Sequence, residues 1–398
     1  MDRKVQRLAD FVSRDAADAG SGRGENSLVD RFGRGLRDLR ISVTDRCNFR
    51  CTYCMPEEKY HSGFEFLTTE QRLDFGEIVR LVRLFTGAGV RKLRITGGEP
   101  LLRPALGDLI GDLRGLPGIE EIALTTNGIL LPQHAAELKA AGLDRVTVSL
   151  DAVDDETFRR MNGGRGGLDR VLDGIDAAID ADLAPVKINA VVQRGVNDAG
   201  VPDLLARFRG TGAIVRLIEY MDVGNINHWS ESDTVPSAEL RARIHERWPL
   251  RAERSNHAGE TATRYLYEDG QGEIGFISSV TEPFCGSCHR ARLSSDGRLF
   301  TCLFATAGHD QQIRLWDVET GDLVRTMGSH DRGFTWHVAF SPDDRELLSC
   351  SDDGTVRIWD VATGEQRLRF DQHQWRVRSA RWSPDGTRVA SCSGNIDH

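Results

Sequence analysis

The stretch RISVTDRCNFRCTYC, residues 40–54, joins a short strand-like run to three closely spaced cysteines. The run alternates polar and apolar residues, which is typical of a strand, and Cys47, Cys51 and Cys54 follow with the spacing Cys-x3-Cys-x2-Cys. Iron–sulfur clusters are normally held by four thiolates. A loop that supplies three leaves one metal position open to a small molecule, as a catalytic zinc keeps an open position. The stretch therefore predicts redox chemistry on a bound ligand at the end of a strand.

Further strand-like runs follow the first one at intervals typical of strand–helix units. Including the first, they cover residues 39–44, 92–96, 121–125, 145–150, 186–192 and 215–220. Amphipathic stretches such as 69–88 and 168–181 lie between them, with apolar residues at helical spacing. Consecutive units of this kind imply a parallel sheet with right-handed crossovers. Six are fewer than the eight of a closed barrel, so we predict an α/β partial (β/α)6 barrel of TIM type.

A second group of three cysteines, Cys285, Cys288 and Cys302, has the spacing Cys-x2-Cys-x13-Cys. Two such groups suggest chemistry on two bound ligands. A zinc knuckle is the alternative for the first group, but three cysteines without a nearby fourth ligand make a poor zinc site. For the second group, His289 could complete a Cys3His zinc site. We favour iron–sulfur clusters at both.

Composition and charge narrow the class of protein. The 398 residues suggest two or three domains, and the net charge of -9 argues against a broad surface for nucleic acid or anionic membranes. We find no transmembrane run, and the first thirty residues lack the apolar segment of a signal peptide. We therefore predict a cytoplasmic protein that binds neither nucleic acid nor membrane. Its cysteine pairs are expected to bind metal rather than to form disulfides.

A different pattern begins near residue 303. The sequence IRLWD at 313–317 recurs as VRIWD at 356–360, and FSPDD at 340–344 recurs as WSPDG at 382–386. A period near 43 residues with a Trp-Asp ending resembles WD repeats, each of which forms one blade of a β-propeller. The segment has room for about two blades, whereas a propeller closes with roughly four to eight. We therefore predict a partial all-β propeller over residues 305–398, with Cys350 and Cys392 as equivalent buried strand thiols.

The cysteine loop resembles that of radical S-adenosylmethionine (SAM) enzymes. Taken with the second cysteine group, residues 32–304 resemble the GTP 3′,8-cyclases of molybdenum cofactor biosynthesis. The resemblance implies two 4Fe–4S clusters, each with an open iron, held by Cys47, Cys51 and Cys54 and by Cys285, Cys288 and Cys302. It also implies that the segment Gly97-Gly98-Glu99-Pro100 meets the amino group of SAM. The expected SAM contacts are Tyr53, Gly98, Glu99, Ser149 and Met221.

The same resemblance implies GTP as the substrate. Arginine suits bidentate contact with phosphate oxygens, and the matching nucleotide contacts are Arg40, Arg94, Thr125, Lys187, Arg216, Arg290 and Arg292. In the implied reaction, the 5′-deoxyadenosyl radical takes the ribose C3′ hydrogen of GTP, and the substrate radical attacks C8 of guanine. An electron and a proton then complete (8S)-3′,8-cyclo-7,8-dihydroguanosine 5′-triphosphate. No side chain is expected to act as an acid or base, because the cofactor carries the chemistry.

The expected partners follow from the resemblance as well. They are a flavodoxin- or ferredoxin-type reductant, a cyclic pyranopterin monophosphate synthase that takes over the product, and a second copy in a homodimer. The expected domains are a polar extension (1–31), the barrel (32–225), a region with the second cysteines (226–304) and the repeats (305–398). The repeat segment is expected to mediate protein contacts.

The junction after Cys302 departs from the family pattern. The sequence passes into the repeats without the polar or Gly/Pro-rich boundary of most domain fusions. The cyclases instead continue to a Gly-Gly tail that reaches the active site. We therefore expect a recombined, misassembled or truncated reading frame with impaired turnover. Two alternatives stay open: a non-catalytic chimeric WD-repeat interaction protein, and a one-cluster radical enzyme that acts on a peptide.

Overall fold

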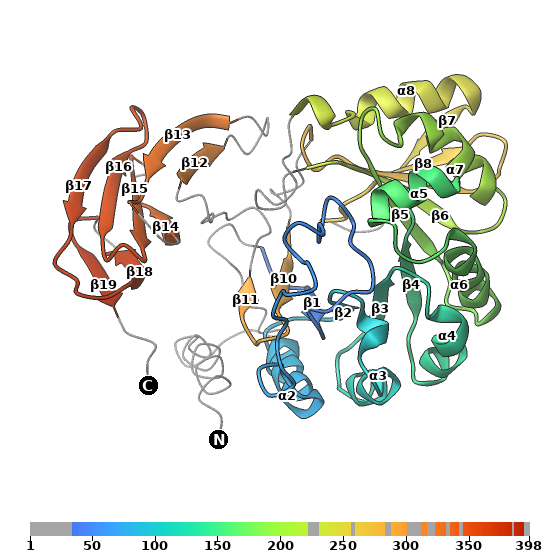
Figure 1. Cartoon of the computed structure of the whole chain (residues 1–398), viewed down its shortest axis with the longest axis horizontal. Helices are drawn as coiled ribbons and strands as arrows, with labels where there is room; N and C mark the ends of the chain where they lie inside the picture. Colours follow the sequence, from blue (N-terminus) through green and yellow to red (C-terminus); the bar gives the residue numbers. More distant parts are fainter. Residues whose placement is uncertain are drawn as a thin grey trace, which may run out of the picture. The chain divides into compact units, whose positions relative to one another are not determined.

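The computed structural model describes residues 34–221, 231–255, 259–282, 288–300, 312–316, 323–331, 335–341, 345–383 and 386–393. They form two compact units, one made chiefly of residues up to 302 and the other chiefly of residues 303–398 (Figure 1). We call residues 34–300 the cyclase-like region and residues 312–393 the repeat region. Among the described residues, no helix is both long enough and apolar enough to span a membrane.

The cyclase-like region is built on one sheet whose central strands are parallel. These are β1 (Asp38–Ser42), β2 (Lys92–Thr96), β3 (Glu121–Thr126), β4 (Arg145–Ser149), β5 (Lys187–Val192) and β6 (Ile214–Glu219). They lie side by side in chain order and are joined by helical crossovers. The predicted parallel α/β sheet is therefore confirmed, with boundaries within one or two residues of those expected.

The sheet extends beyond the predicted strands on both sides. β9 (Glu273–Ile277) pairs with β6 and β10 (Arg290–Leu293) pairs with β1, both in parallel. β7 (Leu250–Glu253) and β8 (Thr263–Tyr267) continue from β9, and β11 (Leu299–Phe300) follows β10, all antiparallel. The sheet order β11-β10-β1-β2-β3-β4-β5-β6-β9-β8-β7 does not pair its two ends, so in the described residues the barrel is open.

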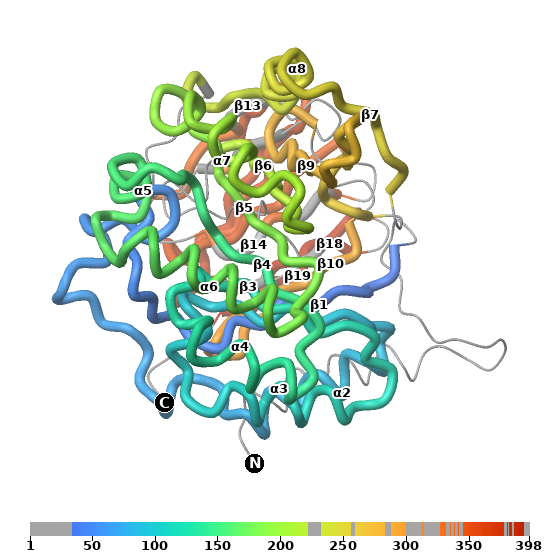
Figure 2. The backbone as a smooth tube through the Cα atoms, turned by 90° about the vertical axis from the view of Figure 1, so that its right-hand side faces the viewer, coloured from blue at the N-terminus to red at the C-terminus, as the bar shows by residue number. Residues whose placement is uncertain are grey.

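Helices cover one face of the sheet. They are α2 (Phe75–Gly87), α3 (Leu106–Arg114), α4 (Leu131–Ala140), α5 (Asp155–Asn162), α6 (Leu168–Asp180), α7 (Val201–Phe208) and α8 (Ser237–Arg247), with short 3-10 turns η1 (Pro100–Leu102), η2 (Asp198–Gly200) and η3 (Glu231–Asp233). Helix α2 begins with a capping box between Asp74 and Glu77. Several of these helices lie in front of the parallel strands in Figure 2. The helices therefore pack against one face of the parallel strands.

The two faces of the parallel strands differ in chemistry. Every second residue, such as Leu39, Ile41, Leu93 and Ile95, is almost fully buried and belongs to the core shared with the helices. Successive side chains of a strand point to opposite faces, and many of the residues between them are polar or charged. We call this second surface the polar face. It holds Arg40, Arg94, Thr125, Thr147, Lys187 and Arg216.

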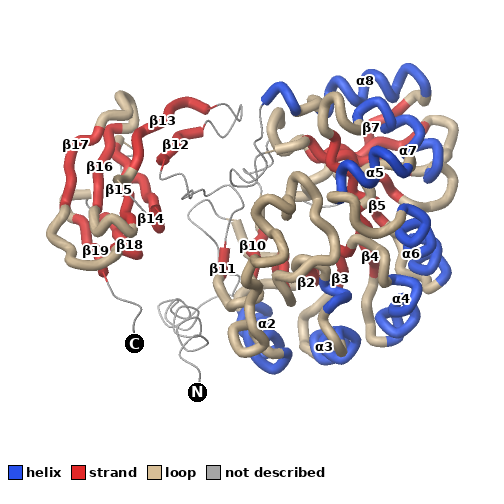
Figure 3. The backbone as a smooth tube through the Cα atoms, in the orientation of Figure 1, coloured by secondary structure: helices blue, strands red, loops and turns tan. Residues whose placement is uncertain are grey.

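The repeat region consists of antiparallel strands, and its described residues contain no helix (Figure 3). A four-stranded sheet is formed by β14 (Thr335–Phe340), β15 (Glu346–Ser351), β16 (Val356–Asp360) and β17 (Gln366–Phe370). Two hairpins accompany it: β12 (Gln312–Trp316) with β13 (Leu323–Ser329), and β18 (Val377–Trp382) with β19 (Val389–Ser393). The expected short all-β segment is confirmed.

Alternation along β15 explains how the hairpins pack. Leu347 joins a cluster with Ile313 and Met327 of the first hairpin, whereas Leu348 joins one with Val377 and Ala380 of the second. Because adjacent strand residues face opposite ways, the four-stranded sheet carries one hairpin on each face.

The prediction of buried thiols in the repeats is correct for Cys350 and wrong for Cys392. Cys350 on β15 has no exposed surface, but Cys392 on β19 is exposed. The two occupy the same repeat position. However, β15 is an inner strand of the four-stranded sheet, whereas the described residues place only β18 beside β19.

Candidate active site

The three cysteines of the first group lie in the loop that directly follows β1. Burial, and then the negative charges of Glu99 and Cys54, raise the pKa of the Cys47 thiol to about 11. Burial and the charges of Asp151, Cys54 and Cys47 raise the pKa of Cys51 well above its usual value. A bound cation would reverse these shifts by favouring the thiolates. The donor set therefore fits a positively charged iron–sulfur core.

A buried arginine holds the backbone of this loop in place. Arg50 is 7% exposed, and its guanidinium donates to the backbone oxygens of Tyr60 (2.8 Å), Cys47 (2.9 Å) and Phe49 (2.8 Å). The end of α5 supports the same loop, because the Arg50 amide donates to the Asn162 oxygen at 3.0 Å. The loop is thus fixed by contacts that do not involve the cysteine side chains.

The glycine pair after β2 packs against the cysteine loop. The amide of Gly98 donates to the Thr44 oxygen and that of Glu99 to the Arg46 oxygen, both at 2.7 Å. A Cβ at Gly97 would lie 2.6 Å from the Thr44 oxygen, and one at Gly98 would lie 2.2 Å from the Arg46 oxygen. The sequence suggested that these glycines admit a ligand. The structure shows in addition that they admit the neighbouring loop.

Glu99 is 1% exposed, and both of its carboxylate oxygens already accept hydrogen bonds. Oε1 accepts from the Thr126 hydroxyl at 2.7 Å and the Leu101 amide at 3.1 Å, and Oε2 accepts from the Asn127 amide at 2.7 Å. Burial raises the pKa of Glu99 to about 7 although these bonds lower it. The Asn127 side chain also donates to Asn48 Oδ1 at 2.6 Å. Glu99 and Asn127 therefore connect the ends of β2 and β3 to the cysteine loop.

Tyr53 is connected to the end of β4. Its hydroxyl donates to Asp151 Oδ2 at 2.8 Å, and Asp151 Oδ1 accepts from the Val191 amide at 2.8 Å. Burial raises the pKa of Asp151 to about 6 against these two bonds. Asp151 thus connects Tyr53 to β5, whereas Asp154 caps α5. Ser149 ends β4, and Met221 lies two residues after β6, so all five predicted SAM contacts lie at the carboxyl ends of strands.

The strand register brings the predicted nucleotide contacts together on the polar face. Arg292, Arg40 and Arg94 occupy one row on β10, β1 and β2. Thr125, Thr147 and Lys187 occupy the next row on β3, β4 and β5, and Asn189 pairs with Arg216 on β5 and β6. The Arg94 guanidinium donates to the hydroxyls of Thr125 at 3.2 Å and Thr147 at 3.1 Å.

These cations repel one another. Burial and the charges of Arg216, Arg145 and Arg94 lower the pKa of Lys187 to about 7. Burial and the charges of Arg145, Arg40 and Arg216 lower the pKa of Arg94 well below its usual value. Within the described part of the chain, the buried Nε atoms of Arg216 and Arg292 have no hydrogen-bond partner. A surface with several cations and unsatisfied donors is suited to a polyanionic ligand.

Comparison with known proteins identifies the family. Residues 41–208 match the model of the radical SAM superfamily, and residues 213–328 match that of Molybdenum Cofactor Synthesis C. The GTP 3′,8-cyclase of Xanthomonas campestris pv. campestris (strain 8004) is 54% identical over 294 residues, which are 74% of this chain and 86% of that protein. The chain belongs to the GTP 3′,8-cyclase family. Residues 321–360 and 364–396 match the WD domain, G-beta repeat.

Other relatives and one solved structure agree with this assignment. The GTP 3′,8-cyclase of Acidothermus cellulolyticus is 54% identical over 71% of this chain and 78% of that protein, and the one from Staphylococcus carnosus is 47% identical over 70% and 82%. The crystal structure of Streptococcus suis SuiB bound to S-adenosylmethionine has a TM-score of 0.50 and 15% identity, over 75% of this chain and 70% of that one. That likeness shows the radical SAM fold alone. As a family member, the chain is an enzyme that uses SAM and iron–sulfur chemistry.

The second cysteine group of this cyclase is described only in part. Cys285 and Cys302 lie outside the described residues, whereas Cys288 directly precedes β10. Its sulfur accepts from Arg290 at 3.3 Å, and His289 Nδ1 lies 2.7 Å from Asp38 Oδ2. Within the described ranges, no three His, Cys, Asp or Glu side chains are arranged around a single metal ion. Cluster ligands bind different irons and need not converge on one point.

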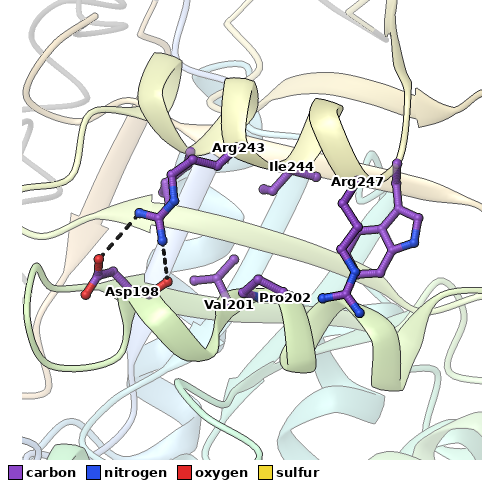
Figure 4. A pocket seen from close by; sticks show the side chains of 8 residues that line it. Asp198, Val201, Pro202, Arg243, Ile244 and Arg247 are labelled. Atoms are coloured by element: carbon purple, nitrogen blue, oxygen red, sulfur yellow. Dashed lines mark hydrogen bonds and ion pairs between the residues drawn. The ribbon is translucent and has the colours of Figure 1, made fainter.

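A small cavity on the helical side is unrelated to this site. It has a volume of about 20 Å³, enough for about one water molecule, and lies between α7 and α8 (Figure 4). Val201, Ile244 and Trp248 line it, and Arg243 pairs with Asp198 at its edge at 3.4 Å. The cysteine loop and the predicted nucleotide contacts instead meet the strands on the polar side of the sheet.

Proposed function

We propose that the protein converts GTP to (8S)-3′,8-cyclo-7,8-dihydroguanosine 5′-triphosphate in the first step of molybdenum cofactor biosynthesis. The observation that carries this proposal is the register that lines Arg40, Arg94, Thr125, Lys187 and Arg216 along the polar face of a sheet whose β1 leads into the cysteine loop. A radical generator and a polyanion site then share one surface. SAM held beside a cluster on Cys47, Cys51 and Cys54 would supply the radical chemistry needed at the ribose of GTP.

The chain's own residues have binding and positioning roles in this proposal. Cys47, Cys51 and Cys54 hold the first 4Fe–4S cluster, and Arg50 fixes their loop. Tyr53, Gly98, Glu99, Ser149 and Met221 hold SAM at the carboxyl ends of the strands. Because Glu99 already accepts three hydrogen bonds, its main contribution is to hold the loops that face the methionine end of SAM.

The nucleotide would extend along the cations. Cys285, Cys288 and Cys302 would hold a second 4Fe–4S cluster, whose open iron would bind the guanine. Arg290 and Arg292 follow Cys288 on β10, and Arg40 lies next to Arg292 on β1. The triphosphate then continues towards Arg94, Lys187 and Arg216. Charge-assisted hydrogen bonds to phosphate oxygens would relieve the repulsion among these side chains.

The remaining parts of the proposal concern partners and location. We place the enzyme in the cytoplasm, as a homodimer reduced by a flavodoxin- or ferredoxin-type protein. Its product passes to a cyclic pyranopterin monophosphate synthase. The domains are those expected from the sequence, at 1–31, 32–225, 226–304 and 305–398, and the repeats mediate protein contacts.

An anaerobic assay on the reconstituted, reduced protein tests the function. It measures 5′-deoxyadenosine and the cyclised nucleotide with SAM, in the presence and absence of GTP. The proposal requires GTP-dependent formation of both products and about eight irons per chain. Deoxyadenosine without cyclised nucleotide would overturn GTP as the substrate, and about four irons would overturn the second cluster.

A further inference from the structure

A group of charged residues at the start of strands β2 to β4 has no role in the function proposed above. Glu121 on β3 lies between Lys92 on β2 and Arg145 on β4. Lys92 Nζ lies 3.3 Å from one carboxylate oxygen of Glu121, and Arg145 Nη2 pairs with the other. The three side chains are 23%, 23% and 14% exposed in the order Lys92, Glu121 and Arg145. We call this group the floor of the polar face.

Arg145 lies in the same row as Arg94. Arg94 pairs with Ala123 across β2 and β3, and Ala123 pairs with Arg145 across β3 and β4. Since Ala123 contributes only a methyl group, the row has space for the two guanidinium groups on either side. Lys187 is in the next row, beside Thr147 on β4. Arg145 therefore lies near Arg94 and Lys187, two of the cations to which we propose the triphosphate binds.

The effect of Arg145 on the pKa values of neighbouring cations agrees with this position in the sheet. After burial, the charge of Arg145 is the strongest influence that lowers the pKa of Arg94 and of Arg216. It also contributes to the lowered pKa of Lys187, after burial and Arg216. The charge of Arg145 therefore acts on all three of these cations, in agreement with its place in the same row as Arg94.

One end of the Arg145 guanidinium is available for a ligand. Nη2 is held by Glu121, whereas Nη1 is buried and has no hydrogen-bond partner among the residues that the structure describes. A guanidinium has five N–H donors in a rigid fork. Arg145 can thus keep its pair with Glu121 and still donate to a phosphate oxygen. A buried donor without a partner has a free-energy cost that such an oxygen would remove.

We propose that Arg145 is a further substrate-binding residue that donates to the terminal phosphate of GTP, and that Glu121 is the positioning residue that holds it. The inference rests on the proposed function. With guanine beside Cys288 and β10, the phosphates run past Arg40 on β1 and Arg94 on β2 towards Arg145 on β4. Glu121 lies at the floor, where its negative charge repels any longer phosphate chain. Together the two residues select a triphosphate over shorter and longer chains.

The test is equilibrium binding of GTP, GDP and inorganic tripolyphosphate to the reconstituted protein by calorimetry. Arg145→Gln is expected to weaken GTP and tripolyphosphate about 10- to 100-fold, the range for a lost hydrogen bond to a charged group. GDP, whose last phosphate does not reach Arg145, is expected to change less than about threefold. Arg145→Lys should restore part of the GTP affinity, because it keeps the charge but not the fork.

Two further variants separate positioning from folding. Glu121→Gln is expected to raise the affinity for guanosine tetraphosphate relative to GTP, which a merely structural role would not do. The double variant Glu121→Gln/Arg145→Gln removes both partners together, so no charge of this pair remains buried alone. Arg159→Gln on the exposed side of α5 is the matched control, because the described residues give Arg159 one ion pair, with Asp155 in its own helix.

The outcomes separate this inference from the function itself. Equal losses for GTP and GDP in Arg145→Gln, or no loss for either, would overturn the inference. Wild-type protein that binds tripolyphosphate but not GTP would overturn the proposed function instead, and the Arg145→Gln effect on tripolyphosphate would then still decide the role of Arg145.

Discussion

The cyclase-like region and the repeat region each contain a cluster of buried charged residues. Among the described residues, the charged groups of the repeat region satisfy one another's hydrogen bonds, whereas those of the cyclase-like region do not. In the repeat region, Asp353 accepts from Arg357 at 2.9 Å and pairs with His330 at 3.0 Å. On the polar face, Arg216 and Arg292 retain unsatisfied buried nitrogens. A satisfied network stabilises a fold. A row of cations with unsatisfied donors has a free-energy cost that a ligand can remove, which supports the proposal that this face binds the nucleotide.

The network of the repeat region extends around one hydroxyl. Ser349 accepts from Trp359 Nε1 and contacts His330 Nε2, both at 2.8 Å. Although burial acts to raise it, hydrogen bonds from His330 and Thr355 lower the pKa of Asp353 well below its usual range. These contacts connect β13 to β15 and β16 and leave little capacity for a ligand.

Cysteine replacement should give the largest contrast between the regions. Cys51→Ala removes a predicted cluster ligand, so we expect loss of deoxyadenosine formation and about four fewer irons per chain. Cys350→Ala changes a fully buried thiol of the repeats that is not in a disulfide, and both readouts should stay at wild-type values. The measurements are iron content and an anaerobic SAM cleavage assay. Retained cleavage in Cys51→Ala would contradict the assignment of the first group.

Ligand binding should stabilise one region and not the other. GTP at about a thousand times its dissociation constant is expected to add about 4 kcal/mol to the free energy of unfolding of the cyclase-like region. The repeat region should not respond. Hydrogen exchange followed peptide by peptide, with and without GTP, measures both regions in the same sample. Protection that appears in β14–β17 and not in β1–β6 would reverse the comparison.

The lowered pKa of Lys187 predicts a pH dependence of nucleotide binding. The free enzyme loses this charge above about pH 7, so kcat/KM for GTP is expected to fall roughly tenfold between pH 7 and 8.5. Lys187→Arg keeps its charge and should remove this decline. Without bound GTP, the stability of the protein should depend on pH in the opposite direction. The unfolded lysine keeps its proton up to about pH 10.4, so the unfolding free energy should rise with pH above 7.

A single hydrogen bond in the repeat network should have the smallest effect. Trp359→Phe removes the donor to Ser349 and keeps most of the ring, so we expect the repeat region to lose about 1 kcal/mol of stability. Cyclisation of GTP should not change. Chemical denaturation followed by hydrogen exchange in β15 and β16 tests the first expectation. An equal loss of protection in β1–β6 would show that the regions do not unfold separately.

Local patterns account for what could be predicted. The alternation in residues 40–44 and the spacing of the three cysteines are properties of neighbouring residues. The same is true of the repeats, where a period near 43 residues predicted the antiparallel strands. Even there, the exposure of Cys392 could not be predicted, because burial depends on which strands cover a position and not on the repeat itself.

By itself, the sequence determined the parallel sheet, the cysteine loop and the repeats, since periodicity and motif spacing act over short stretches of chain. Only the tertiary structure decided that Glu99 is already bonded by Thr126 and Asn127 and that Tyr53 meets Asp151. It also decided that Arg145 is between Glu121 and the cations of three other strands. These contacts join residues far apart in the chain, and they depend on a strand register that is set by packing of the opposite, apolar face.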